Sequence, residues 1–315
     1  DALAVDLLSD SERGRANGLM YGSKYLGGAV GGAGLGWVIA TYGMSAALAT
    51  QAVILVAILL LPLMLREGTS EASSGARNGV PGHESALPTP HARQALLAAS
   101  RVALRRSVGL LADLLKAFSL RSTLLGAAFA VGAYIGAGVL STVGAVLITQ
   151  KIGWTAEHYA AVQGGLCLAF GLGGAVLGGF IADFVGPRRL VAIASTTLGA
   201  LWIAFALAES MWSSAPFVTV VLVAESTLVA ILSVGLFALF MQLAWPRVAA
   251  TQFTAYMSLL NLSTTLGHAA AGTLDALMDY SAMYLVVGVV QIAIVALLIG
   301  IDPGQTRREL QHSSV

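Results

Sequence analysis

The sequence predicts an all-α polytopic membrane protein. Its 315 residues are 57% hydrophobic and only 10% charged, and its mean hydropathy is +0.81. A soluble domain usually carries about a quarter charged residues, so this chain could not cover a water-facing surface at that density. Long apolar runs recur along the chain without strand-like alternation, and helices satisfy their own backbone hydrogen bonds in lipid. These observations favour membrane-spanning helices.

Eight runs are long enough, or nearly so, to cross about 30 Å of hydrocarbon, which takes roughly 20 apolar residues. They lie at about 17–40, 45–65, 122–148, 159–182, 190–208, 215–243, 249–274 and 282–301. A long connector, 66–121, separates the second run from the third. Its first part is rich in Gly, Ser and Pro and predicts a flexible linker. Its second part has apolar residues at helical spacing, which indicates either an interfacial helix on the membrane surface or an ordinary soluble helix.

The basic residues gather on one side of the predicted membrane. With eight spans, all 17 Lys and Arg residues except Lys24 and Lys151 fall in the N-terminal segment, the connector, two short loops and the C-terminal tail. These segments share one side, and the positive-inside rule makes that side cytoplasmic. An odd number of spans would scramble the segregation, so the charges support the count and predict cytoplasmic termini.

The turn between the fourth and fifth runs reads GGFIADFVGPRR. Gly179 allows a neighbouring helix to approach closely, and Asp183 can pair with cations or with the N-terminal dipole of another helix. Gly186 allows a turn with positive φ, and the pair Arg188 and Arg189 holds the loop at the cytoplasmic surface. Together they predict a conformational latch; the alternative is an ordinary positive-inside loop that contains an Asp by chance.

This turn resembles the loop motif of major facilitator superfamily transporters, Gly-x-x-x-Asp-(Arg/Lys)-x-Gly-x-(Arg/Lys)-(Arg/Lys). Phe184 stands where the family usually has a base, which weakens the expected charge network. The resemblance implies twelve spans in two six-helix bundles, of which this chain corresponds to spans five to twelve with the first four missing. We therefore expect the chain to be inactive alone. The implied divisions are the last two helices of the N-terminal bundle (1–65), the cytoplasmic connector (66–121), the six-helix C-terminal bundle (122–301) and a cytoplasmic tail (302–315).

Two further stretches are similar to the AmpG-like muropeptide permeases, which share a branch of the superfamily with the acetyl-CoA transporters. One is the N-terminal region, with Glu12-Arg13-Gly14 followed by a base within the helix at Lys24. The other is 249–267, which contains Ala250-Thr251-Gln252-Phe253. The resemblance implies proton-coupled import of a muropeptide-like or other amphipathic anionic solute through a bacterial-type inner membrane. The alternatives are another carrier, with an acyl-CoA compound as substrate, and a non-transporting membrane sensor.

One basic and one acidic residue lie well inside predicted spans. Lys24, with Tyr21 and Tyr25 on the same helix, should bind an anionic group of the substrate in a water-filled cavity, or else extend to the cytoplasmic surface. Glu225 lies about ten residues from either end of its span. Because apolar surroundings disfavour a charged carboxylate, it is a candidate for proton coupling; the alternative is a neutral acid hydrogen-bonded to a neighbouring helix.

The seventh predicted span carries Gln252, Asn261 and His268. Asn261 and His268 are two helical turns apart and therefore lie on one face. They either line the transport pathway, with His268 as a further proton site, or hold helices together by hydrogen bonds. Tyr134 and Gln163, in the third and fourth spans, are substrate-binding candidates of the same kind.

Glycines recur at four-residue spacing on two spans, at Gly27/Gly31, Gly28/Gly32 and Gly174/Gly178. Such pairs allow tight helix packing. The fifth and eighth helices of the superfamily meet across the bundle interface, so the resemblance predicts contact between the first and fourth spans of this chain.

Other kinds of chemistry lack support in the sequence. The single Cys167 excludes an intrachain disulfide, and the five His residues lack metal-ligand spacing, so neither a metal nor another cofactor is expected. The glycine-rich pieces lie within spans and no P-loop is present, so nucleotide hydrolysis is not expected. An enzyme would need a nucleophile beside a base, and Ser263 and Thr264 near His268 have a spacing that occurs by chance. The expected partners are the solute, protons, the lipid bilayer and the first four helices, but no nucleic acid.

Overall fold

The computed structural model describes residues 13–29, 31, 34–64 and 109–311. These residues are almost entirely helical, and no strand occurs among them. The chain divides into two compact units, one formed by Asp1–Ala29 with Leu110–Val315 and the other by Val30–Gly109. The first predicted run, 17–40, is therefore shared between the units rather than belonging to one.

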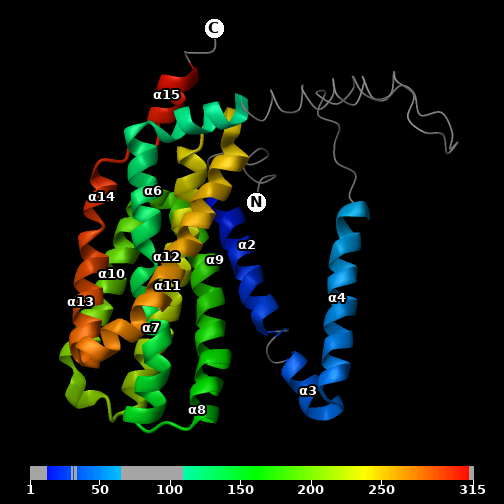
Figure 1. Ribbon diagram of the computed structural model, residues 1–315, viewed down its shortest axis with the longest axis vertical. Helices are drawn as coiled ribbons and strands as arrows, with labels where there is room; N and C mark the ends of the chain where they lie inside the picture. Colours follow the sequence, from blue (N-terminus) through cyan, green and yellow to red (C-terminus); the bar gives the residue numbers. More distant parts are fainter. Residues whose placement is uncertain (1–12, 30, 32–33, 65–108, 312–315) are drawn as a thin grey trace, which may run out of the picture. The chain divides into compact units, whose positions relative to one another are not determined.

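The larger unit is a helical bundle (Figure 1). Its helices are α2 (Arg13–Ala29), α6 (Arg121–Ala133), α7 (Ile135–Val146), α8 (Ala156–Ala161), α9 (Leu168–Val185), α10 (Pro187–Leu207), α11 (Ala215–Leu243), α12 (Ala249–Leu277), α13 (Tyr280–Ala293), α14 (Ala296–Ile299) and α15 (Gln305–Gln311). Short π-helical segments, η3 (Leu147–Lys151) and η4 (Val162–Cys167), extend α7 and join α8 to α9. Single 3₁₀ turns, η5 (Glu209–Met211) and η6 (Pro246–Val248), precede α11 and α12.

The smaller unit contains α3 (Leu35–Tyr42) and α4 (Met44–Met64), which pack against each other. They are joined at Gly43, whose φ of 84° is readily adopted only by glycine.

Five helical segments among the described residues are long and apolar enough to cross a membrane. They are Arg121–Lys151, Ala156–Val185, Pro187–Leu207, Ala215–Leu243 and Tyr280–Ile299. The prediction of membrane helices is therefore confirmed, with bounds within a few residues of those expected. α12 spans 29 residues but is more polar, and Met44–Leu60 is apolar but shorter. The count of eight spans stays a prediction.

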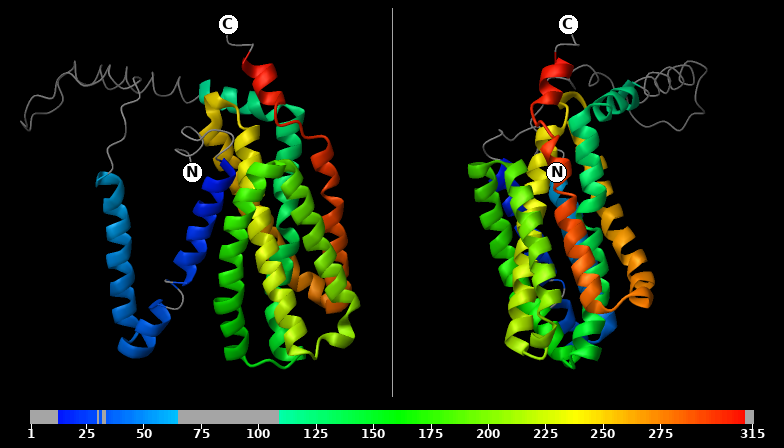
Figure 2. Two further views of the ribbon diagram at one scale, coloured as in Figure 1. Left: turned by 180° about the vertical axis from the view of Figure 1, so that it is seen from behind. Right: turned by 90° about the vertical axis from the view of Figure 1, so that its left-hand side faces the viewer.

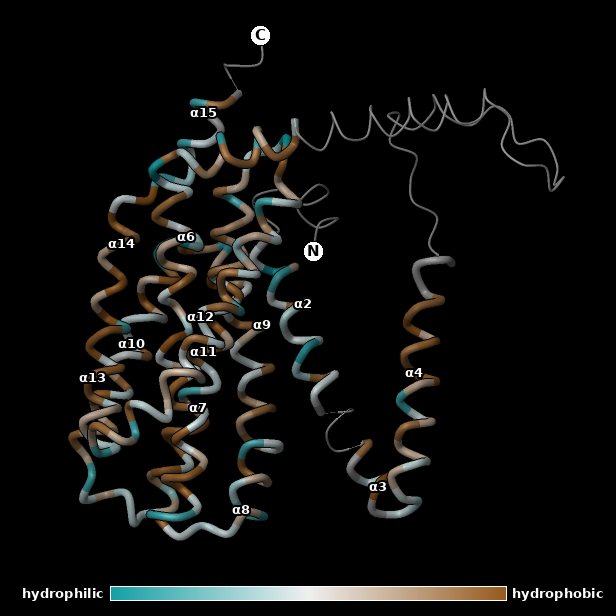
Figure 3. Tube along the Cα trace, viewed as in Figure 1, coloured by the Kyte–Doolittle hydropathy of each residue, from teal (hydrophilic) through white to brown (hydrophobic). Residues whose placement is uncertain are grey.

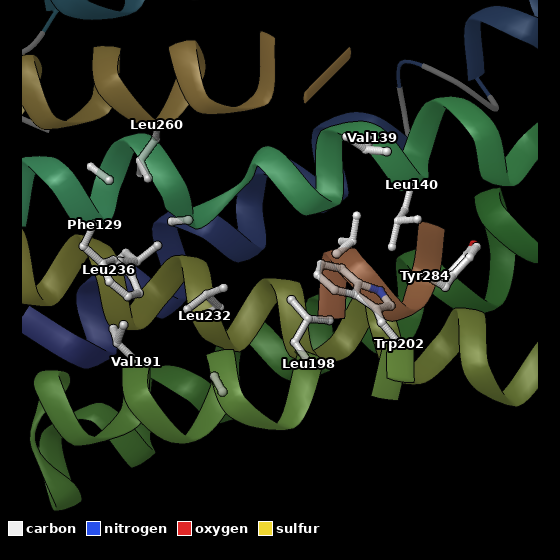
Figure 4. Close-up of a cluster of buried hydrophobic side chains, with 14 of the residues drawn as sticks. Phe129, Val139, Leu140, Val191, Leu198, Trp202, Leu232, Leu236, Leu260 and Tyr284 are labelled. Carbon is white, nitrogen blue, oxygen red and sulfur yellow. The ribbon is translucent and has the colours of Figure 1, made fainter. Parts of the chain in front are cut away.

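Within the larger unit, α9, α10 and α12 each pack mainly against two neighbouring helices (Figure 2). α9 contacts α2 and α11, α10 contacts α11 and α13, and α12 contacts α6 and α7. Figure 3 shows that hydrophobic residues dominate the middle of α9, α10, α11 and α13, whereas α2 is more polar along its length. Figure 4 shows part of the buried core, in which Phe129, Leu198, Trp202, Leu232 and Leu236 are fully buried. The apolar core thus runs between α6, α10 and α11.

Three pairs of glycines let helix backbones touch directly. Gly14 faces Gly179 between α2 and α9, Gly138 faces Gly267 between α7 and α12, and Gly199 faces Gly288 between α10 and α13. A β-carbon added at Gly199 would lie 2.7 Å from the carbonyl oxygen of Gly288, and the reverse substitution gives the same distance. No side chain larger than hydrogen fits at this crossing without a backbone shift.

The predicted contact between the first and fourth spans is confirmed, since α2 packs on α9. The predicted glycines contribute little to it. A β-carbon at Gly27 would meet nothing within 4 Å, one at Gly28 would lie 3.9 Å from Leu168 of α9, and Gly174 and Gly178 face Thr227 and Ile231 of α11. Gly32 lies outside the described residues. Glycine spacing identified helix faces able to pack closely, but it could not say which neighbour each face would meet.

One end of the larger unit carries nearly all of its described basic residues, and we call it the basic end. These residues include Arg15, Lys116, Arg121, Arg188, Arg189, Arg247 and Arg308, whereas Lys151 lies at the opposite end. A helix over 109–118 lies across the basic end (Figure 1), where its Ala117 packs with Trp245 and Leu310. Leu111 and Leu115 are exposed. A helix was expected in the second part of the connector, either interfacial or soluble, and the exposed leucines do not distinguish the two; most of the predicted connector lies outside the described residues.

Candidate functional site

A cavity of about 480 Å³ in the larger unit collects five predicted site residues. We call it the lysine cavity. Its polar residues are Tyr21, Lys24, Tyr134, Ser141, Asn261, Thr264 and His268, and its apolar residues are Ala137, Val229, Phe237, Met257 and Leu260. The wall is built by α2, α7, α11 and α12, together with Tyr134 at the junction of α6 and α7. Residues more than 240 positions apart, such as Lys24 and His268, thus line one space.

Lys24 has its side chain exposed on α2. Its ammonium nitrogen lies 5.0 Å from the ring centroid of Tyr21, one turn earlier, which is a cation–π distance. Among the described residues, the ion pairs lie elsewhere and no carboxylate pairs with Lys24. Its positive charge is therefore available to an anion that enters the lysine cavity.

Tyr134 and His268 are held in place by neighbouring helices. Tyr134 interrupts the helix with φ −120° and ψ 8°, and its backbone N–H donates to the hydroxyl of Ser263 at 2.8 Å. Its phenol shares a short hydrogen bond with the hydroxyl of Ser233. The Nδ1 atom of His268 lies 2.9 Å from the hydroxyl oxygen of Thr142. Ser263 and His268 thus have separate partners rather than each other.

A second cavity, of about 230 Å³, adjoins the first and shares Ala137, Ser141 and Val229 with it. We call it the glutamate cavity. Its other lining residues are Tyr25, Leu140, Gly144, Ile148, Tyr159, Gln163, Leu222, Glu225, Ser226 and Tyr284. The structure therefore separates the predicted site residues into two groups, with Tyr25, Gln163 and Glu225 in this cavity.

The carboxyl group of Glu225 has one hydrogen bond from the described residues. The indole N–H of Trp202 on α10 donates to Glu225 Oε1 at 3.0 Å, and Trp202 is fully buried. Figure 4 shows Trp202 in the core near Leu198. Glu225 as a residue is only partly buried and lines the cavity, so a carboxyl group held by the core lies beside open space.

The backbone beside the glutamate cavity is irregular. The π-helical segment η4 carries Gln163 and ends at Cys167. The Cys167 carbonyl accepts a hydrogen bond from the hydroxyl of Ser226 at 2.7 Å, and Gln163 Nε2 donates to the Tyr159 hydroxyl at 3.0 Å. Short π-helical segments inside longer helices occur often at functional sites.

Comparison with known proteins decides the family. A family model described as Major Facilitator Superfamily matches residues 1–268, which is most of the chain. The chain belongs to the major facilitator superfamily. Members of this superfamily are transporters, not enzymes. No curated protein sequence matches the chain significantly.

The superfamily's loop motif makes a contact between helices at the basic end. Asp183 on α9 accepts hydrogen bonds from the backbone N–H groups of Gly14 at 2.8 Å and Arg15 at 3.1 Å, and from Arg15 Nε at 3.0 Å. These N–H groups belong to the first turn of α2, so the carboxylate caps that helix and faces its positive dipole end. Phe184 is 91% exposed and takes no part. The base that pairs with Asp183 comes instead from α2.

The five predicted latch residues do not form one cluster. Gly179 and Asp183 face α2, whereas Arg188 turns the other way and donates to the Ile299 carbonyl at 3.1 Å. Gly186 has a φ of 88°, the left-handed turn expected there. Arg189 is exposed. The arginine pair therefore lies in different surroundings from the Asp183 contact.

Three residues gained a role only from the structure. Trp202 is the hydrogen-bond partner of Glu225, and Arg15 is the partner of Asp183. The tryptophan could have been noticed in the sequence, because a buried indole N–H normally has an acceptor. Asn17 is fully buried, and its amide nitrogen lies 3.4 Å from Met241 Sδ of α11.

Gln252 lines neither the lysine cavity nor the glutamate cavity. It is buried and accepts a hydrogen bond from the backbone of Trp245, so it stabilises the turn before α12.

Proposed function

We propose that this protein is a proton-coupled secondary transporter that imports a muropeptide-like or other amphipathic anionic solute by alternating access. The main support is the arrangement of Lys24, Tyr21, Tyr134 and Asn261 around one cavity that adjoins the cavity of Glu225. The family match supports transport by this class of carrier, and the resemblance to the AmpG-like permeases suggests the solute.

The lysine cavity suits a solute with one anionic end and a partly apolar body. A carboxylate or phosphate could pair with Lys24, and such a pair is stronger in a cavity with apolar walls than in water. Phenol and amide groups from Tyr21, Tyr134 and Asn261 can hydrogen-bond sugar hydroxyls or peptide groups. The wall also contains Phe237, Met257 and Leu260, which can bury the apolar parts of a solute.

Glu225 suits the exchange of a proton with the cavity. Trp202 holds one carboxyl oxygen, and the residue lines the cavity. The titratable groups that share its cavity are the phenols of Tyr25, Tyr159 and Tyr284, and the described lining includes no positive charge. Because the two cavities adjoin, occupation of one can change the affinity of the other by a coupling free energy.

We further propose that the protein lies in a bacterial-type inner membrane with its basic end in the cytoplasm. Of the described Lys and Arg residues at the ends of the larger unit, all except Lys151 lie at one end, as the positive-inside rule requires of a cytoplasmic face. Both termini are then cytoplasmic.

The test is uptake of labelled anhydro-muropeptide by the full-length protein in proteoliposomes, with and without an inward proton gradient. Uptake that exceeds that of empty liposomes and depends on the gradient is the expected result. Absence of uptake by correctly folded protein would overturn the muropeptide assignment. Uptake of acyl-CoA compounds would then favour the other branch of carriers, and absence of both would favour a membrane sensor.

A further inference from the structure

A third cavity, of about 560 Å³, lies at the basic end, separate from the lysine and glutamate cavities. We call it the arginine cavity. Its polar side consists of Arg188, Arg189 and Gln242, beside the turn at Gly186 and Pro187, and its apolar side of Val185, Ala192, Val295, Leu298, Ile299 and Pro303. It shares no lining residue with the two cavities assigned to transport.

This cavity lies at the boundary between the apolar spans and the polar basic end. The span Pro187–Leu207 begins at it, and the span Tyr280–Ile299 ends at it. Ile299 is 77% exposed on the apolar side, and Arg189 is exposed on the polar side. The cavity therefore lies at the depth where lipid headgroups meet acyl chains.

The charges of the cavity favour an anion. Arg188 uses one of its five N–H donors on the Ile299 carbonyl. Arg189 has no hydrogen bond or ion pair with any described residue. The nearby acid, Asp302, accepts from the Gly304 backbone and forms an ion pair with Arg308; these contacts, and to a smaller extent the charge of Arg188, hold the pKa of its carboxyl below the usual value. Arg189 and the remaining N–H donors of Arg188 can therefore bind an anionic group.

We propose that the arginine cavity binds an anionic phospholipid, with its phosphate between Arg188 and Arg189 and an acyl chain along Val295, Leu298 and Ile299. Guanidinium groups match phosphate oxygens in geometry as well as charge. A small soluble anion would use only the polar side of the cavity, whereas a phospholipid uses both. Basic cavities between helices on the cytoplasmic side are suited to lipid headgroups in this way.

The bound lipid has a structural consequence. The turn that presents Arg188 and Arg189 follows directly from the end of α9 that carries Asp183. A phospholipid that holds this turn therefore stabilises the helix end on which the α2 contact depends. Anionic lipid should raise the thermal stability of the protein more than zwitterionic lipid does.

The experiment measures lipid binding and does not depend on any transported solute. The purified full-length protein in detergent is titrated with phosphatidylglycerol, with phosphatidylcholine of the same acyl chains, and with inorganic phosphate. Retained lipid is counted by native mass spectrometry, and the melting temperature is recorded in parallel. Phosphatidylglycerol should bind more tightly than phosphatidylcholine, and inorganic phosphate at the same concentration should neither stabilise the protein nor displace the lipid.

Variants assign the binding to this cavity. The double change Arg188→Gln/Arg189→Gln should weaken phosphatidylglycerol binding roughly tenfold or more, since each arginine near lipid phosphates contributes about fivefold. The control Arg247→Gln removes an arginine at the same end that pairs with Asp113 outside the cavity, and it should leave the lipid preference unchanged. If the double variant does not fold, Arg189→Gln alone, at an exposed site, should weaken binding about fivefold.

Three results would overturn the proposal. One is equal binding of the two lipids by the unmodified protein. Another is unchanged phosphatidylglycerol binding in a folded Arg188→Gln/Arg189→Gln variant, or in Arg189→Gln when only that variant folds. The last is stabilisation by inorganic phosphate equal to that by phosphatidylglycerol, which would assign the cavity to a soluble anion.

Discussion

The carboxylate of Asp183 and the backbone N–H of Gly14 form a 2.8 Å hydrogen bond across α9 and α2, although 169 positions separate them in the chain. The contact depends on the absence of side chains. A β-carbon on Gly14 would collide with the Asp183 carboxylate and with the carbonyl of Gly179. Asp183 can therefore reach the first turn of α2 only because glycines lie on both helices.

Removing the Asp183 carboxylate should loosen this contact. We expect Asp183→Ala to destabilise the packing of α2 on α9 by about 1–2 kcal/mol, since it loses an N-cap and a charge–dipole interaction. The measurements are thermal unfolding and initial uptake rate, and both should fall. Asp279→Ala is the control, because Asp279 caps α13 through the Ala282 N–H within its own segment; it should lower stability alone. Unchanged stability and uptake in Asp183→Ala would contradict the expectation.

The glycine crossing of α10 and α13 should not tolerate a methyl group. We expect Gly199→Ala to destabilise the protein by about 1–3 kcal/mol, because the new β-carbon would overlap the Gly288 carbonyl and force the helices apart. Thermal unfolding in detergent measures the effect. Gly173→Ala serves as the matched control: nothing lies within 4 Å of its added β-carbon, so helix propensity should leave it neutral or stabilised by up to about 1 kcal/mol. Equal melting temperatures for the two variants would show that the crossing can adjust.

Loss of the Lys24 charge should weaken binding of an anionic solute. We expect Lys24→Ala to raise the KM for uptake at least tenfold, because an ion pair in the lysine cavity is lost, and Lys24→Arg to keep most of the affinity. Concentration-dependent uptake gives the values. Lys151→Ala is the control, since Lys151 pairs with Glu209 at the opposite end from the basic residues; its KM should not change. A Lys24→Ala variant with normal KM would place the anion elsewhere.

Glu225→Gln should separate proton coupling from solute movement. The amide keeps the shape of the carboxyl group but cannot exchange a proton, so we expect proton-driven uptake to be abolished and solute exchange to be retained. The assay compares gradient-driven uptake with exchange across a range of pH. Glu209→Gln, an exposed acid outside both cavities, should behave as the unmodified protein does. If uptake by Glu225→Gln keeps its normal pH dependence, another group carries the proton.

Much of the site could be anticipated from single residues whose chemistry conflicts with their surroundings. A lysine and a glutamate inside apolar spans are costly unless they face a cavity or a partner, so Lys24 and Glu225 stood out. Both line cavities in the structure. Asn261 and His268 were predicted to share a helix face, and both line the lysine cavity. Their roles in binding and proton transfer remain predictions.

Partners could not be anticipated in the same way. Trp202 donates to Glu225 from 23 positions away, and Arg15 pairs with Asp183 from 168 positions away. The sequence around each of these residues does not predict which residue will be its partner. The residues of the predicted latch are close in sequence but make contacts at two separate places. The chain turns at Gly186, so Asp183 before the turn contacts α2, whereas Arg188 after the turn contacts Ile299.

Hydropathy and charge in the sequence were enough to predict that this protein is helical and lies in a membrane, and to single out the charges within predicted spans and the motif of its family. These properties depend on hydropathy, charge distribution and local spacing, which can be read directly from the sequence. The three-dimensional arrangement was needed to show which helices touch at glycines, which residues share each cavity, and that Arg188 and Arg189 line a third cavity. Those relationships depend on contacts between segments far apart in sequence, and one-dimensional periodicity fixes the face of a helix but not the neighbour that the face will meet.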